Sequence, residues 1–199
     1  SVDIPRRLSQ KAGQAFLAAR LDEAPLVPER LDAAWCCQSL FSLPEPVQCL
    51  ARMGRLVRPG GLVVVLENDS LHQLMLPWPP ELELAIRTAE YATFRERSPQ
   101  PQKFYVGRWL PRCFRDAGLE PRGFVTKTID RQAPLDPAAE AFLRLHLRQL
   151  RNRTRPRLDA RSRRALDDLL RDDEGQSWFR DPSFTLTWMN VLAWACRPE

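Results

Sequence analysis

The sequence has no long apolar run. Its 199 residues contain no uninterrupted apolar stretch that approaches the roughly 18 residues of a membrane-spanning helix. The first seven residues, Ser-Val-Asp-Ile-Pro-Arg-Arg, also lack the apolar segment of a secretion signal. We therefore expect a cytoplasmic protein with no membrane span.

Cysteine is present, but in no pattern that suggests a site. The five cysteines are an odd number, and their spacing is not that of metal ligands. Reduced, mostly buried thiols are the simplest interpretation, and we expect no metal. The cysteines are Cys36, Cys37, Cys49, Cys113 and Cys196.

Arginine is abundant and unevenly placed in a chain of formal net charge +5. Residues 144–164 contain nine arginines and one acid, Asp159. Such a cluster is typical of a nucleic-acid footprint or of the solvated face of a packed helix. Leu143, Leu147 and Leu150 mark one helix face as apolar, and no aromatic residues are interleaved for base stacking. A solvated face is favoured over nucleic acid, while an anionic acceptor or partner and RNA stay open as alternatives.

Residues 52–69 carry the most informative fold signal. Helical spacing over residues 46–57 is followed by the turn sequence Pro59-Gly60-Gly61 and the apolar run 62–66. An apolar run without alternation is typical of a strand buried on both faces, as in a parallel sheet covered by helices. Ligands of such sheets lie beyond the carboxyl ends of the strands. Polar chemistry is therefore expected at Glu67–Asp69.

The remaining pattern alternates strands and helices, which indicates an α/β fold of doubly wound character. The predicted strands cover residues 2–4, 15–19, 31–36, 62–66, 123–129 and 184–195. The predicted helices cover residues 5–12, 46–57, 81–97, 106–117, 137–151 and 159–171.

Several sequence segments, taken in chain order, resemble segments of the class I S-adenosylmethionine-dependent methyltransferases of the small-molecule type. These segments are residues 16–26, residues 31–40, Arg55-Leu-Val-Arg-Pro-Gly-Gly61 and residues 109–119. The resemblance implies a Rossmann-like, mostly parallel sheet whose last strand is antiparallel. It also implies one domain over residues 1–199, with helical cap segments at 71–102 and 130–182.

The same resemblance implies a site for S-adenosylmethionine. Asp3 stands where the family's acid takes the ribose hydroxyls, although an Asp before Pro5 also suits a helix N-cap. Arg20 stands where the family often has an acid, and Gln38 serves the cofactor by its amide or only by its backbone. The implied cofactor-binding residues are Asp3, Ile4, Arg20, Leu21, Cys37 and Gln38.

The family's first strand and glycine-rich cofactor loop have no counterpart before Val2. The one Gly-Gly pair, Gly60-Gly61, precedes a strand and is a turn rather than a cofactor cradle. We expect an N-terminally incomplete domain belonging to a longer enzyme. The alternative is a degenerate relative that pairs its strands differently and has lost the cofactor.

Methyl transfer needs a positioned acceptor and, for a poor nucleophile, a general base. His72 is the candidate base because histidine titrates near neutral pH, and a structural hydrogen-bonding role is its alternative. A small, apolar or aromatic acceptor is expected, although aromatic residues at helical spacing also suit a core. The candidate substrate-binding residues are Glu67, Asn68, Asp69, Trp78 and Tyr105.

Two other functions stay open. The first is an RNA methyltransferase that uses the arginine cluster of residues 144–164. The second is a non-catalytic Rossmann-like module that binds a partner. The acceptor's identity, the methylated atom and the oligomeric state are not encoded in any pattern that we recognise.

Overall fold

The computed structural model describes residues 17, 19, 21, 23–171 and 178–199. The elements expected within residues 2–12 lie outside this part of the chain, and the strand expected at 15–19 lies mostly outside it. Asp3, Ile4 and Arg20 are outside it as well. The described strands are β1 (Leu31–Cys37), β2 (Val57–Glu67), β3 (Leu74–Met75), β4 (Glu120–Gln132) and β5 (Thr185–Cys196).

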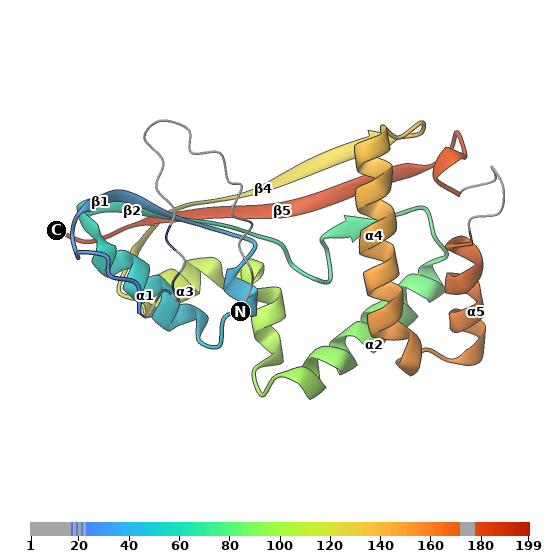
Figure 1. Cartoon of the computed structure of the whole chain (residues 1–199), viewed down its shortest axis with the longest axis horizontal. Helices are drawn as coiled ribbons and strands as arrows, with labels where there is room; N and C mark the ends of the chain where they lie inside the picture. The colour runs from blue at the N-terminus through green and yellow to red at the C-terminus, as the bar shows by residue number, and fades with distance from the viewer. Residues whose placement is uncertain (1–16, 18, 20, 22, 172–177) are drawn as a thin grey trace.

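The five described strands form one sheet in the order β1-β2-β5-β3, with β4 also paired to β5. β1 and β2 are parallel, and β5 is antiparallel to β2, β3 and β4. Four strands therefore run in one direction and the last strand runs against them, which confirms the expected fold class. β4 and β5 form a long ribbon that extends from the sheet to the region of α2, α4 and α5 (Figure 1).

Residues 52–69, which carry the fold signal, form a helix end, a turn and a strand as expected. Leu31 pairs with Val57 and Ala33 with Leu62, so residues 58–61 bulge out of the ladder. This bulge contains the Pro59-Gly60-Gly61 turn, and Gly60 has φ 73°, a left-handed conformation that costs glycine little. The polar triplet that follows the apolar run therefore lies at the carboxyl end of β2.

Helices cover the sheet largely where periodicity predicts them. The exception is the helix expected at 106–117, which is divided into the 3₁₀ segment η2 (Pro101–Trp109) and α3 (Leu110–Asp116). Tyr105 is non-helical within η2, and Pro111 lies in the first turn of α3, where proline is tolerated. The other helices are α1 (Pro46–Leu56), α2 (Pro80–Arg97), α4 (Pro137–Thr154) and α5 (Ala160–Leu169).

The buried apolar residues form two clusters, which we name the sheet core and the cap core. The sheet core lies among β2, β5, α1 and α3, and its largest side chain is Phe114. The cap core lies among β3, α2, α4, α5 and the start of β5, and includes Leu147. The sheet core comprises Leu40, Leu50, Met53, Val57, Val63, Val65, Val106, Leu110, Phe114, Leu119, Val191, Ala193 and Ala195.

β5 contributes to both cores from opposite faces. Leu186 belongs to the cap core and Trp188 packs against it, whereas Val191 and Ala193 belong to the sheet core. Since successive side chains of a strand alternate between faces, this assignment follows from the period of two. Asn190 shares the face of Trp188 and lies between the two cores along the strand.

β1 is an open edge within the described part of the chain, where it pairs only with β2. Its Trp35 is 59% exposed, and Leu62 on the neighbouring strand is 38% exposed. A central strand of a covered parallel sheet would bury such side chains. One apolar face and one row of backbone hydrogen-bonding groups therefore face outward here.

All five cysteines are free thiols, and Cys37 is exposed while the other four are half-buried, so they are less buried than expected. Burial raises the pKa of the Cys36 thiol to about 11. None of the helices in the described ranges has the length and apolarity that a membrane crossing requires.

Candidate functional site

Gln38 opens the site at the carboxyl end of β1. Its φ of 45° turns the chain out of the strand, and its N–H donates to the Leu66 carbonyl at 2.7 Å. The exposed Gln38 amide donates from Nε2 to Asn190 Oδ1 at 2.9 Å. Trp188 Nε1 lies 3.4 Å from the same oxygen. Gln38 is thereby linked across the sheet to β5, and exposed Cys37 precedes it.

Glu67 at the end of β2 is fully buried and turned toward the loop after β1. Its Oε1 accepts from the backbone N–H groups of Ser39 at 2.9 Å and Leu40 at 2.6 Å. Its Oε2 has no hydrogen-bond partner among the described residues. Burial raises the pKa of Glu67, and the Leu40 and Ser39 N–H groups oppose that shift. This carboxyl group holds the Gln38 loop.

Asp69 carries the principal charged cluster of the site. Arg108 from η2 donates to both carboxylate oxygens, from Nε to Oδ2 and from Nη2 to Oδ1 at 2.6 Å. This side-chain hydrogen bond raises the pKa of Arg108. The Leu71 N–H also donates to Asp69 Oδ1, at 3.0 Å. Asp69 is 8% exposed, so its charge is compensated almost entirely from within the protein.

His72 lies beside this carboxylate but faces solvent. Its Nδ1 is 3.4 Å from Asp69 Oδ1 and 3.5 Å from Arg108 Nη2, and its side chain is 64% exposed. The two contacts require opposite tautomers, because Asp69 only accepts and Arg108 only donates. With Nδ1–H directed to Asp69, the other nitrogen, Nε2, can accept a proton.

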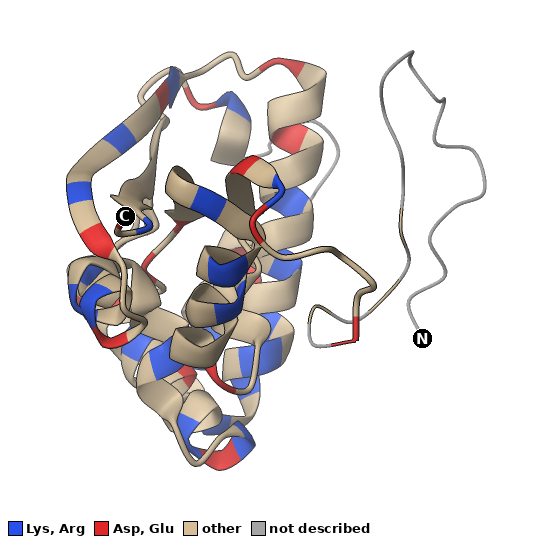
Figure 2. Ribbon diagram, turned by 90° about the vertical axis from the view of Figure 1, so that its left-hand side faces the viewer, with Lys and Arg blue, Asp and Glu red and all other residues tan. Residues whose placement is uncertain are grey.

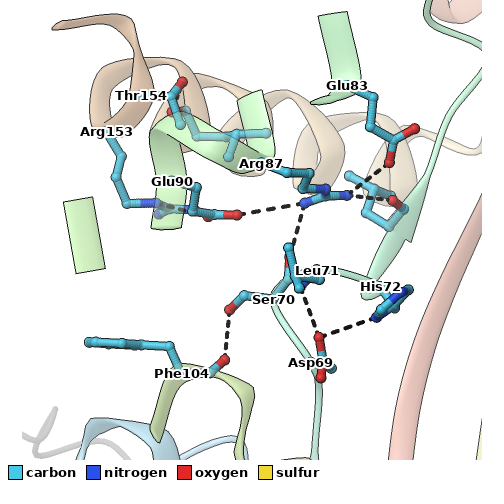
Figure 3. Close-up of polar contacts among 12 residues, drawn as sticks. Asp69, Ser70, Leu71, His72, Glu83, Arg87, Glu90, Phe104, Arg153 and Thr154 are labelled. Atoms are coloured by element: carbon cyan, nitrogen blue, oxygen red, sulfur yellow. Dashed lines mark hydrogen bonds and ion pairs between the residues drawn. The ribbon is translucent and has the colours of Figure 1, made fainter. Parts of the chain in front are cut away.

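The loop between β2 and β3 is fastened on two sides. Ser70 Oγ donates to the Phe104 carbonyl of η2 at 2.9 Å. On the other side Arg87 of α2 donates to the carbonyls of Ser70 and Leu74 (Figure 3). Half-buried Asn68 precedes this loop, and Gly107 approaches its backbone so closely that a Cβ would lie 3.1 Å from the Asn68 oxygen.

Trp78 and Tyr105, two candidate acceptor contacts, are each 6% exposed. Trp78 belongs to the cap core and donates from Nε1 to Glu83 Oε2 at 3.1 Å. The Tyr105 hydroxyl has no partner among the described residues. Its pKa is raised to about 12 by burial and then by the nearby carboxylates of Glu90 and Asp69. Both side chains are therefore buried and not open to an acceptor in this structure.

The structure thus gathers Gln38, Glu67, Asn68, Asp69 and His72 at one edge of the sheet. Leu21 is half-buried and packs against the sheet core. His146 is not part of this group: it stacks edge-on against Trp188 with ring centroids 5.0 Å apart. In the described ranges, no group of three His, Cys, Asp or Glu side chains is placed to hold a metal ion.

Three residues that contribute to the site were not predicted from the sequence. Asn190 had a usable signal, because it is the polar residue within the otherwise apolar run from Trp188 to Cys196. Arg108 and Arg87 had none, since each is one arginine among many and only the tertiary structure selects its partner.

The arginine cluster is largely paired with acids. Arg144 contacts Glu140, Arg151 and Arg155 contact Asp167, Arg153 contacts Glu90, and Arg157 contacts Glu96. Figure 2 shows basic residues interspersed with acidic ones over the helices. The charges therefore serve packing between α2, α4 and α5 to a large extent.

Comparison with known proteins gives a match over the first third of the chain. Residues 1–65 match the family model described as a methyltransferase domain. A 72-residue stretch is 36% identical to malonyl-[acyl-carrier protein] O-methyltransferase from Pseudescherichia vulneris. This stretch covers 35% of the chain and spans 29% of that relative.

Solved structures resemble the chain at lower identity. A proposed methyltransferase from Bacillus halodurans C-125 is 12% identical with a TM-score of 0.48, over 92% of this chain and 78% of that one. Geranyl diphosphate C-methyltransferase from Streptomyces coelicolor A3(2) is 15% identical with a TM-score of 0.37, over 91% and 52%. Likenesses at this level say nothing of activity or substrate.

Proposed function

We propose that this chain is part of a class I S-adenosylmethionine-dependent methyltransferase that methylates a small molecule, because its first third matches the methyltransferase domain family. The observation that carries the proposal is the family match over residues 1–65. It is supported by the polar edge formed where β1 and β2 end, because ligands of α/β sheets lie at that edge.

The described residues fit one side of the cofactor. Cys37 and Gln38 are exposed where β1 ends, and the Gln38 amide is held by Asn190. When bound, S-adenosylmethionine supplies an activated methyl group on its sulfonium. In this proposal Gln38 would contact the methionine part. Leu21 would lie on the ribose and adenine side, as the family resemblance also implies for Asp3, Ile4 and Arg20, which lie outside the described residues.

The general base in this proposal is His72. Asp69 orients Nδ1–H, and Arg108 holds Asp69, so that Nε2 is directed outward to take a proton from the acceptor. Asn68 and Asp69 lie next to His72 on the acceptor side in this proposal, while buried Glu67 holds the loop that bears Gln38. The protein's main task is to align acceptor and methyl group.

An apolar or aromatic acceptor is supported by a chain of contacts that leads from Gln38 to the cap. Asn190 joins Gln38 to Trp188, and the Trp188 ring lies 5.1 Å from that of Phe142 on α4. Phe142 is 52% exposed, and Met75 on β3 is 62% exposed. These side chains supply the accessible apolar surface, while Trp78 and Tyr105 are buried and offer little surface to an acceptor.

The open edge of β1 supports the proposal that the domain is incomplete in this chain. A further parallel strand belonging to the rest of the domain would pair with the backbone groups of β1, and a helix packed on the same face would cover Trp35. A non-catalytic module that offers this edge to a partner is the rival proposal. The RNA alternative is disfavoured, because at least five arginines of residues 144–164 already contact acids.

A methyl-transfer assay tests the proposed function. The complete gene product is supplied with S-adenosylmethionine labelled in its methyl group and with malonyl thioester, phenolic or RNA acceptors in separate reactions. Transfer to a small acceptor is expected. The His72→Ala variant should reduce turnover strongly and leave S-adenosylhomocysteine affinity intact. Unchanged turnover would remove His72 from the mechanism, and transfer to RNA alone would favour the rival enzyme.

A further inference from the structure

One buried side chain holds both ends of the loop that carries His72. Arg87 on α2 is 8% exposed. Its Nη1 donates to the Ser70 carbonyl at 3.0 Å, and its Nη2 donates to the Leu74 carbonyl at 2.8 Å. These carbonyls lie two residues before and two residues after His72. The planar guanidinium therefore fixes their separation, and with it the path of the loop between them.

The position of Arg87 is itself fixed by charge. Glu83 lies 3.4 Å and Glu90 lies 3.6 Å from its terminal nitrogens. Glu90 is 2% exposed and also accepts from Arg153 of α4, with Nε at 3.1 Å. A buried charge is tolerated only when it is paired and hydrogen-bonded, so each partner restrains the others. Figure 3 shows this network extending from α4 through α2 to the loop.

We propose that Arg87 is a positioning residue for His72, acting by fixing the loop from Ser70 to Leu74 against the cap. The proposal rests on the proposed function, in which His72 is the base. Arg108 and Phe104 restrain the opposite side of the same loop, through Asp69 and Ser70. Without Arg87 the loop keeps those contacts, and Gln73 and Leu74 keep their pairing with β5, but the loop loses its attachment to α2, so the direction of the imidazole is less restrained.

Lysine is an informative replacement. The Arg87→Lys variant keeps the positive charge between Glu83 and Glu90, but a single ammonium group lacks the planar fork that spans the two carbonyls. Arg87→Met removes the charge as well. The matched control is Arg95→Gln, which changes an exposed arginine on the same helix. If Arg87→Met fails to fold, Arg87→Lys still reports on the loop.

Amide hydrogen exchange tests the structural half of the proposal without any substrate. The amides of Leu71 and His72 are bonded to Asp69 Oδ1 and to the Asp69 carbonyl. In Arg87→Lys these two amides should exchange about tenfold faster, while the exchange of amides in the β2–β5 ladder stays unchanged. In the Arg95→Gln control the Leu71 and His72 amides should exchange at the rate of the unmodified protein. Loop exchange equal to that of the unmodified protein would overturn the proposal.

A double-variant cycle tests whether Arg87 acts through His72. Arg87→Lys should lower kcat about tenfold with little change in S-adenosylhomocysteine affinity, and it should add nothing in the His72→Ala background. Additive losses would overturn the positioning role, as would a His72→Ala variant with full turnover. If the unmodified protein transfers no methyl group, the proposed function fails, and the exchange result alone decides the claim about the loop.

Discussion

The sheet core and the cap core are held together in different ways. In the sheet core the buried carboxyl group of Glu67 accepts only backbone N–H groups, and strand ladders fix the positions of β1, β2 and β5. Beside the cap core, buried Glu90 of α2 pairs with Arg87 of the same helix and with Arg153 of α4, so the Glu90–Arg153 pair joins the two helices.

This difference indicates how each region serves the site. Strand pairing sets the carboxyl ends of β1 and β2 side by side, and that places Gln38 near Glu67 and Asp69. Helices have no ladder to fix their register against a neighbour, so charged pairs define how α4 and α2 meet. The loop with Asp69 and His72 is held in both ways, by the strand that precedes it and by charged side chains of the helices.

The largest effect is expected from removing Phe114, which is fully buried in the sheet core. Phe114→Ala should lower the free energy of unfolding by about 3–5 kcal/mol, because it removes apolar contacts and leaves a cavity. Urea titration followed by circular dichroism measures the loss. Leu147→Ala is the matched change in the cap core. Two separate transitions in either variant would show that the cores unfold independently, and a loss below about 1 kcal/mol would contradict the packing.

The next largest effect is expected from Glu90→Gln in the cap. It removes the negative charge between Arg87 and Arg153 but keeps one acceptor oxygen, so a loss of about 2–3 kcal/mol in unfolding free energy is expected. The same urea titration measures it. A neutral outcome would mean that the cap is held by its apolar contacts and not by these ion pairs.

The stability of the cap region should also depend on pH, through His146 on α4. Burial, followed by the charges of Arg153 and Arg87, lowers the pKa of His146 from 6.5 to about 4. Below pH 6.5 the unfolded chain binds a proton that the folded chain does not, so stability falls as the pH drops toward 4, by at most roughly 1.4 kcal/mol per pH unit. His146→Leu should flatten this dependence. An equal slope in the variant would assign the effect to other groups.

The smallest effect is expected at the surface of the cap. Asp167 contacts Arg151 and Arg155, and hydrogen bonding to Arg151 lowers the pKa of this carboxyl. Asp167→Asn should cost about 0.2–1 kcal/mol, because exposed ion pairs are screened by water and salt. Thermal unfolding at low and high salt measures it. A loss as large as that of Glu90→Gln would contradict the contrast between buried and exposed pairs.

Much of the fold could be predicted from the sequence because it depends on local patterns. The apolar run 62–66, the helical spacing of residues 46–57 and the stop at Gly118 all correspond to observed features. The division of the helix at 106–117 was not predicted, because hydrophobic spacing continues across the junction of η2 and α3 at Trp109 and Leu110.

The candidate site could be predicted only in part. Its place at the ends of β1 and β2 follows from the topology, and Gln38, Asp69 and His72 lie there. The direction in which Glu67 points and the choice of Arg108 and Arg87 as partners depend on contacts between segments far apart in sequence. The composition of an arginine-rich chain contains no information about which arginine is buried.

The central claim is that this chain forms part of an S-adenosylmethionine site at the ends of β1 and β2. Calorimetry with S-adenosylhomocysteine tests it most directly, on the complete gene product, on the 199-residue chain alone and on the Gln38→Ala variant of the complete product. We predict binding by the complete product, weaker binding by its Gln38→Ala variant and none by the chain alone. Absence of binding by the complete product would contradict the account.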